Sequence, residues 1–259
     1  MVLYLCHLTL HDNVFFASRE MGILYETETY LHNWALSFAL FEVSYIPKPY
    51  RLQGEMAKRP GYLEADHEQN LLYLNQAGIY VFPALPILWS HQISTFNVSP
   101  GGYHDQPRKF GQQGADRNYP SYGRIKELAV GSRYRTYIIA PETVQIPRWI
   151  RLGKWASKIR VDAEPIPEAR IKSGSGEFIC KHPLNPIDLP SSTRLLLYDR
   201  IVMPPVSLLR QSQLLGEYWE IGEPTEWIPL SEETNLQSPL DRVYLPRGLA
   251  YGASTVTAP

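Results

Sequence analysis

The sequence has few cysteines and no long apolar run, and both absences narrow the class of protein. Only Cys6 and Cys180 occur among 259 residues, so a disulfide scaffold is excluded and a reducing compartment is expected. No window reaches the roughly 18 consecutive apolar residues that a membrane-spanning helix requires. The first residues, 1–7, lack a basic leader and a small-residue cleavage site, so no secretory signal is predicted. We therefore expect a cytoplasmic protein with no membrane partner.

The sequence also lacks the compact motifs of most enzymes and metalloproteins. It contains no Gly-x-Ser-x-Gly, no His-Glu-x-x-His and no dinucleotide-binding fingerprint. Cys6, His7 and His11 are not predicted to bind a metal, because Cys6 would face away from both histidines on a strand and no further ligand completes the set. The pair His104-Asp105 could exchange protons, but no nucleophile accompanies it. We expect no catalytic residue, no metal and no cofactor.

The net charge of −1 is an average over two regions of opposite sign. Residues 108–160 hold twelve Lys and Arg against three acidic residues, a net charge of +9, and the remainder of the chain carries −10. A concentrated basic stretch suits a polyanion, because each phosphate that is neutralised releases counterions. Aromatic residues are interspersed among these cations, and flat rings stack on unpaired bases. A merely solvated basic face is the alternative, and nucleic acid is preferred because the positive charge coincides with glycine-rich segments whose backbone amides can reach phosphates. Single-stranded RNA is favoured over duplex DNA, because no predicted helix is long and basic enough to enter a major groove.

Two parts of the basic window carry the candidate RNA-binding residues. Residues 97–126 form a long irregular excursion rich in glycine and proline, and loops of that length are often functional. In the second part, Gly153 stands between Arg151 and Lys154, where glycine allows a ligand backbone to approach closely. The predicted RNA-binding set is Arg108, Lys109, Arg117, Tyr119, Tyr122, Arg124, Arg148, Trp149, Arg151, Gly153, Lys154, Trp155 and Lys158.

Hydrophobic periodicity predicts a chain of mixed α and β character. Apolar residues that alternate with polar ones predict strands, and apolar residues three to four apart predict helices. Thr27 or Thr29 is expected to cap the longer helix, and Gly78 is expected to end the shorter one. The predicted strands of the first part span 2–10, 79–82, 134–140 and 158–161, and the predicted helices span 28–43 and 64–76.

The run Ser173-Gly174-Ser175-Gly176 predicts a hinge or turn between two parts of the chain. Residues 1–172 are expected to form an α+β domain with an insertion at about 97–126. Residues 173–259 are expected to form a smaller β-rich region. Its predicted strands span 177–180, 195–203, 218–221 and 242–245.

Several stretches resemble one protein family. The resemblance covers most of the chain and is carried by residues 8–22 (LTLHDNVFFASREMG), 30–36 (YLHNWAL), 78–83 (GIYVFP), 150–158 (IRLGKWASK), 197–200 (LYDR) and 203–208 (MPPVSL). These blocks are similar to the Csc-one family of type I-D CRISPR effector complexes, the type I-D branch of the Cas-five group. Across the wider group only the turn at 152–154 is shared, and that match is loose.

The resemblance implies a fold, a role and a set of partners. The implied fold is a ferredoxin-like, RNA-recognition-type domain with a long hairpin, or thumb, insertion and a smaller β part. The implied role is to hold the 5′ handle of the CRISPR RNA at one end of the backbone filament. The implied neighbours are a backbone subunit of the Cas-seven type and a large subunit of the Cas-ten type, which reads the short DNA motif beside the target sequence. Target DNA near that motif is implied as a further partner.

Two other functions remain open from the sequence. Some members of the wider group cut precursor RNA without a metal, and Tyr103, His104 and Lys109 could supply the side chains for that reaction. Type I-D systems have a separate endoribonuclease, by implication of the family, so a non-catalytic role is preferred. Alternatively, the acidic remainder of the chain could dock basic protein neighbours, which would make the protein mainly an adaptor.

Overall fold

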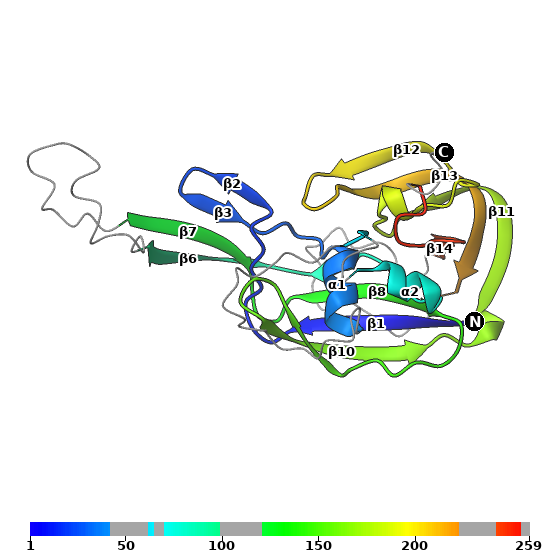
Figure 1. Ribbon diagram of the computed structural model, residues 1–259, viewed down its shortest axis with the longest axis horizontal. Helices are drawn as coiled ribbons and strands as arrows, with labels where there is room; N and C mark the ends of the chain where they lie inside the picture. The colour runs from blue at the N-terminus through cyan, green and yellow to red at the C-terminus, as the bar shows by residue number, and fades with distance from the viewer. Residues whose placement is uncertain (42–61, 65–69, 99–120, 223–241, 255–259) are drawn as a thin grey trace, which may run out of the picture.

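The computed structural model describes residues 1–41, 62–64, 70–98, 121–222 and 242–254, and its strands form three sheets (Figure 1). Of the residues that the structure describes, 51% are in strands and 10% in helices, so this part of the chain is mostly β and has less helix than the α+β prediction suggested. No helix in these ranges is both long and apolar enough to cross a membrane.

The first sheet has the strand order β4-β8-β1-β10-β9, with β5 also paired to β8. All of these pairings are antiparallel. The strands predicted at 2–10, from alternation, and at 134–140, from a β-rich run before Pro141, are confirmed. Burial alternates along most of the first strand, whereas residues 136–140 of the second are buried on both faces of the sheet. The strands are β1 Val2–Leu10, β4 Tyr80–Val81, β5 Leu85–Leu88, β8 Arg133–Ala140, β9 Trp149–Leu152 and β10 Ser157–Pro165.

Helix α1, Asn33–Leu40, covers one face of this sheet. Its Leu36 and Leu40 pack in a cluster with Leu8 and Ile150. The helix is shorter than the predicted 28–43 and is capped by His32, whose Nδ1 accepts a hydrogen bond from the Trp34 amide at 3.2 Å.

Neither Thr27 nor Thr29, the caps predicted from the sequence, caps the helix, and the Thr27 hydroxyl is used elsewhere. The Thr27 hydroxyl donates to the Phe16 carbonyl (2.9 Å) and accepts from the Phe16 amide (3.0 Å). Thr27 is therefore unavailable as a cap, and residues 27–31 lead into the helix instead of forming its first turn. The second helix, α2, spans Leu72–Gln76 and is followed by Gly78 at φ +65°, as predicted, while residues 65–69 of the expected helix lie outside the described ranges.

A second sheet forms an arm that extends from the body of the molecule on the left of Figure 1. Its order is β2-β3-β7-β6, with β3 and β7 parallel and the other pairs antiparallel. The expected insertion at 97–126 therefore has regular strands at its base, beginning at 91 and ending at 128, and residues 99–120 are outside the described ranges. The strands are β2 Arg19–Met21, β3 Leu24–Glu26, β6 His91–Val98 and β7 Ser121–Leu128.

The third sheet follows residue 170 and has the order β11-β13-β12, with β14 paired to β13. Strands were expected at all four places and are present, each longer than predicted or shifted. Two short 3-10 helices, Glu168–Arg170 and Pro186–Asp188, border it. The strands are β11 Ile171–Cys180, β12 Arg194–Ile201, β13 Leu208–Ile221 and β14 Val243–Pro246.

The predicted hinge at Ser173 to Gly176 is wrong, because these residues lie inside β11 and pair with β13. A Cβ on Gly174 would come within 2.5 Å of the Tyr218 ring, so glycine there makes room for an aromatic side chain. Gly176 lies opposite Gly216 at φ +134°, a conformation that favours glycine. The glycines therefore serve packing and local bending of a strand.

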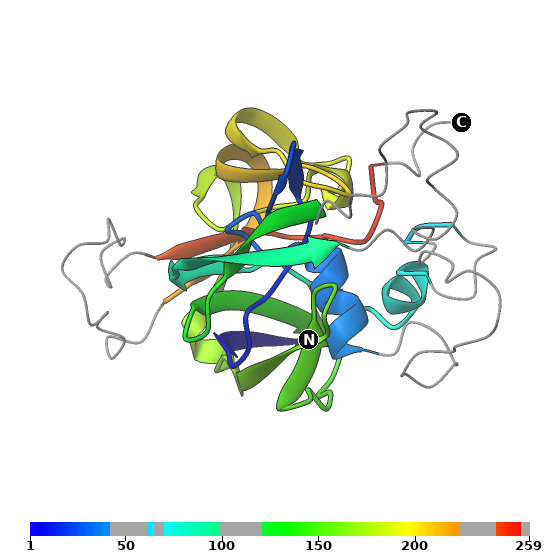
Figure 2. The same cartoon turned by 90° about the vertical axis from the view of Figure 1, so that its left-hand side faces the viewer.

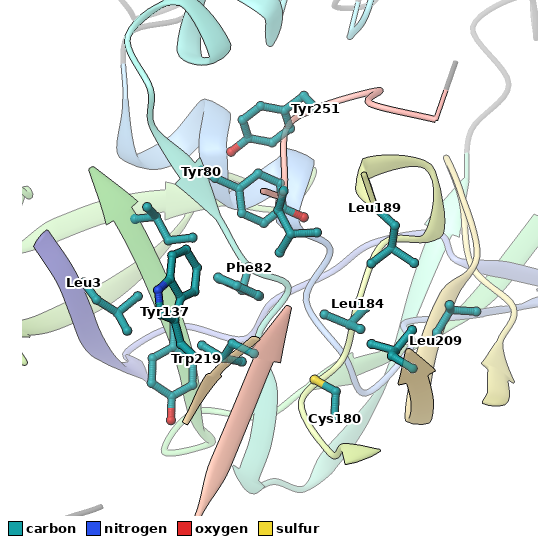
Figure 3. Packing of buried hydrophobic residues seen from close by; sticks show 14 of the residues in the cluster. Leu3, Tyr80, Phe82, Tyr137, Cys180, Leu184, Leu189, Leu209, Trp219 and Tyr251 are labelled. Carbon is teal, nitrogen blue, oxygen red and sulfur yellow. The ribbon is translucent and has the colours of Figure 1, made fainter. Parts of the chain in front are cut away.

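The first and third sheets share one hydrophobic core. Leu3 and Tyr137 of the first sheet lie in the same cluster as Cys180 and Trp219 of the third (Figure 3). In Figure 2 the yellow strands of the third sheet lie above the green and blue strands of the first. The third sheet therefore covers part of the face of the first sheet that α1 leaves open. The division of the chain into one domain of residues 1–172 and a second region of residues 173–259 stays a prediction.

The last described residues are tied into this core by polar contacts. The Tyr251 hydroxyl lies 2.7 Å from the Ser37 hydroxyl and accepts from the Val81 amide at 2.9 Å. The Tyr251 ring lies 5.0 Å from the Tyr80 ring (Figure 3). Asp188, which is fully buried, accepts a hydrogen bond from the neighbouring Gly252 amide at 2.9 Å. These contacts connect α1, β4 and the segment that follows β14.

Candidate nucleic-acid interface

The hairpin of β9 and β10 forms the free edge of the first sheet and divides its side chains between two faces. Ile150 and Ile159 are paired in register and buried against α1. Their neighbours along the strands face the other way and are exposed. These outward residues are Trp149, Arg151, Lys158 and Arg160.

The positively charged ammonium group of Lys158 is in contact with the aromatic ring of Trp149. The Lys158 Nζ lies 4.1 Å from the centre of the Trp149 ring, and His11 approaches the same ring edge-on at 5.0 Å. Trp149 is still 44% exposed. An exposed ring beside an ammonium group can accept an unpaired base and its phosphate at neighbouring positions.

The turn that joins the two strands projects a second cation and a second aromatic ring. The Lys154 amide donates to the Phe15 carbonyl at 2.9 Å, which fastens the turn to the loop after β1. The Trp155 ring lies 4.9 Å from the Phe15 ring and is 55% exposed. Lys154 itself is exposed, so the turn presents both side chains to solvent.

Gly153 is required by the shape of this turn. Its φ is +79°, and a Cβ would lie 2.8 Å from the Phe15 carbonyl oxygen. We expect Gly153→Ala to lower the free energy of unfolding by about 1–3 kcal/mol, because alanine is strained at this φ and cannot approach Phe15 as closely. Urea unfolding measures the loss. Gly131→Ala is a matched comparison, since Gly131 also has a positive φ (+84°) but open space around it; an equal loss in both variants would show that close approach to Phe15 contributes nothing.

The remaining predicted residues are distributed over other places. Arg148 lies opposite the buried Val161 and is therefore outside the row of Trp149 and Arg151. Arg124 is exposed on β7 of the arm, and Tyr122 lies on the same strand. The other four predicted residues lie outside the described ranges: Arg108, Lys109, Arg117 and Tyr119.

Sequence reasoning left out several residues that share the face of this hairpin. Arg160 is on β10 beside Trp149, and Arg133 and Arg135 are on β8. Thr9 of β1 pairs with both Arg160 and Arg133. The alternation of Arg133 and Arg135 around the buried Tyr134 was a usable signal, because it places both cations on one face of a strand.

The two cysteines are shielded from solvent. Burial raises the pKa of the Cys6 thiol, and burial raises the pKa of Cys180 to about 12, so neither is a ready nucleophile. Burial, and next the charge of Arg135, lower the pKa of His7. Within the described ranges, no cluster of three His, Cys, Asp or Glu side chains could hold a metal ion. The residues Tyr103 and His104 considered for RNA cleavage lie outside those ranges.

Comparison with known proteins gives one match that covers nearly the whole chain. The family model described as type I-D CRISPR-associated protein Cas5/Csc1 matches residues 1–254. Among solved structures, the chain is similar to a CRISPR protein from Archaeoglobus fulgidus, with 10% sequence identity, a TM-score of 0.36, and coverage of 86% of this chain and 97% of that one. A search of curated proteins found no match.

Proposed function

The chain belongs to the type I-D CRISPR-associated Cas5/Csc1 family, and on this premise we propose that it is a non-catalytic subunit that binds the 5′ handle of the CRISPR RNA. The family match confirms the resemblance seen in the sequence. Membership supports a role in a CRISPR effector complex. Binding of the RNA handle, the choice of neighbours and the absence of cleavage are the parts that we propose.

One observation carries the proposal: the edge hairpin exposes two tryptophans among cations. Trp149 and Trp155 offer flat rings, and Arg151, Lys154 and Lys158 offer positive charge, all within the ten residues 149–158. Single-stranded RNA is bound by this combination of stacking and phosphate contacts. Arg151 donates a hydrogen bond to the Ala156 carbonyl at 3.2 Å and has a long ion pair, 3.9 Å to Asp12, but it is exposed, so its charge is available to a phosphate.

The strand order of the first sheet supports the ferredoxin-like fold that the resemblance implies. In that fold the first strand is central, the third and fourth strands flank it, and the second lies beyond the third. Here β1 lies between β8 and β10, and β4 lies beyond β8, with α1 connecting β1 to β4. Strand β9 occupies the part of the chain where the second helix of that fold would lie. We propose that the first sheet is a ferredoxin-like domain with one helix replaced.

The proposed neighbours follow from family membership. We propose that the subunit links a Cas-seven-type backbone filament to a large Cas-ten-type subunit, close to target DNA, in the cytoplasm. The arm is the proposed thumb. On it, Arg124 is exposed, whereas Lys126 is held by Glu26 at 2.5 Å, which leaves Arg124 as the freer cation of β7 among the described residues.

Reversing three charges on the hairpin tests the RNA site. We expect Arg151→Glu, Lys154→Glu and Lys158→Glu together to weaken binding of handle RNA about tenfold or more. The dependence of log affinity on log salt should become shallower by about 2, since each phosphate contact to a single strand contributes about 0.7. Fluorescence anisotropy of labelled handle RNA at several salt concentrations measures both.

A matched triple variant controls for the change in net charge. Lys172→Glu, Arg194→Glu and Arg200→Glu alter three exposed cations of the third sheet and should leave both quantities near those of the wild type. Equal weakening in the two triple variants would contradict the hairpin assignment. Incubation of the protein with labelled repeat RNA in EDTA tests the non-catalytic role, and a single defined cut would overturn it.

A further inference from the structure

Strand pairing extends the basic surface from the edge hairpin across the middle of the first sheet. In antiparallel sheets, paired residues project from the same face. Following the pairs from β9 through β10 and β1 to β8 gives one continuous row of four residues on the face away from α1. We call it the central row, and its members are Trp149, Arg160, Thr9 and Arg133.

A second row lies beside the central row on the same face. Arg151 pairs with Lys158, and the His11 amide donates to the Lys158 carbonyl at 2.9 Å, which aligns His11 with them. The two rows together contain four Arg and Lys side chains. Two carboxylates border them: Asp12, 3.9 Å from Arg151, and Asp162, which pairs with Arg160. In the next row, toward the third sheet, His7 pairs with both Arg135 and Asp162. The guanidinium of Arg135 lies 5.9 Å from the buried Tyr137 ring, whereas Asp162 is exposed, so only the β8 end of this row is covered.

The cations of the central row are available to an anionic ligand. Arg160 contacts Asp162 through two nitrogens at 2.7 and 2.8 Å, but both side chains are about half exposed, so this pair is weak and exchangeable. Arg133 is exposed and forms no ion pair with the residues that the structure describes. Thr9 lies between them and adds a hydroxyl donor.

The composition of the central row favours the sugar–phosphate backbone over the bases. Trp149 is its only aromatic residue, and it stands at the end of the row, on the edge hairpin. The other three members are arginines and a threonine, which contact phosphates without reading sequence. With strands roughly 4.8 Å apart, the row spans about 14 Å, enough for a short stretch of extended backbone.

We propose that the central row is a track for the phosphodiester backbone of single-stranded RNA, leading from the edge hairpin across β1 to β8. This inference rests on the proposed function, because the hairpin supplies the point where the RNA enters. The track raises affinity without base preference, and the bases stacked at Trp149 and Trp155 are the ones that the protein can distinguish.

The test is the double variant Arg133→Glu, Arg160→Glu, which leaves the hairpin tryptophans and Lys158 in place. The probes are labelled handle RNA and poly-U and poly-A of equal length. We expect affinity to fall by a similar factor for all three, and the salt dependence to become shallower by about 1.4. Arg194→Glu, Arg200→Glu on the third sheet is the matched control and should behave as the wild type.

The possible outcomes separate this inference from the proposed function. If wild-type protein binds none of the RNAs, the proposed function fails. If the hairpin triple variant is weakened while the Arg133, Arg160 variant matches the wild type, only the track is wrong. A loss confined to one sequence would also overturn the track, since it would show base contacts. If the glutamates lower the unfolding midpoint, Arg133→Gln, Arg160→Gln removes the same two charges and should give the same change in salt dependence.

Discussion

Replacing Asp188 by alanine is expected to lower the free energy of unfolding by about 3–5 kcal/mol, since each buried donor left without a partner costs about 1–3 kcal/mol. The carboxylate is fully buried and accepts hydrogen bonds from Asn33 Nδ2 at 2.8 Å, Tyr80 Oη at 3.1 Å and the Gly252 amide at 2.9 Å. Alanine removes all three acceptor contacts at once. Because these donors come from α1, β4 and the segment that follows β14, the variant weakens the contacts between parts of the chain that are far apart in sequence.

Urea unfolding at pH 7 measures the effect of the alanine variant. Asp162→Ala is the matched control, because Asp162 is an exposed carboxylate paired with Arg160 and should contribute less than about 1 kcal/mol. Equal losses in the two variants would show that the buried network does not stabilise the fold. Tyr251→Ala should resemble Asp188→Ala in size, since a fully buried aromatic side chain is lost together with its hydroxyl contacts.

Acidification from pH 7 to pH 4.5 is expected to lower the free energy of unfolding by about 3 kcal/mol. Burial lowers the pKa of His182 to about 3 and that of His32 to about 4. In the unfolded chain both histidines take up protons near pH 6.5, whereas the folded protein keeps them neutral, so protons favour unfolding below that pH. Asp188 opposes this, because burial raises its pKa to about 6 and the folded protein binds a proton that the unfolded chain does not.

Two variants show how much His182 and Asp188 each contribute to the change in the free energy of unfolding with pH. His182 Nε2 lies 2.8 Å from the Pro83 carbonyl, with the Phe82 and Tyr137 rings and the charge of Arg135 around it. His182→Gln should remove most of the loss between pH 6.5 and 4.5. Asp188→Asn should make the loss larger, because the opposing proton uptake disappears. Urea unfolding at half-unit pH steps measures each slope, and a wild-type stability that stays flat over this range would contradict the assignment.

The parts of the fold that the sequence predicted are those decided by local periodicity. Strand β1 has the predicted bounds, 2–10: its even-numbered side chains from Tyr4 to Leu10 are buried on one face, and Leu3 is buried on the other. Helix α1 was predicted at the correct place, but the predicted helix was too long. The sequence does not show that the Thr27 hydroxyl bonds to the Phe16 backbone and so cannot cap the helix. The glycines at 174 and 176 were misjudged for a similar reason, since Tyr218 and Gly216 are their neighbours only through strand pairing.

The candidate site divides in the same way. Gly153 and the residues around it were predicted because cations, rings and a glycine turn are adjacent in the chain. Arg133 and Arg160 were not selected, because they lie 27 positions apart in the chain and Thr9, near its start, brings them into one row. The register of β1 between β8 and β10 decides that these residues become neighbours in space.

The sparse cysteines, the short apolar runs and the separation of charge into a basic window and an acidic remainder are properties of the sequence alone. The family blocks were sufficient to predict the type I-D CRISPR family, which the family match confirms, and RNA binding stays a prediction. The tertiary structure decided which cations share a surface, which of them are paired, and which glycines bend a strand and which shape a turn. The reason is physical: periodicity and composition act between neighbours in the chain, whereas strand register and burial bring together residues that are far apart in it.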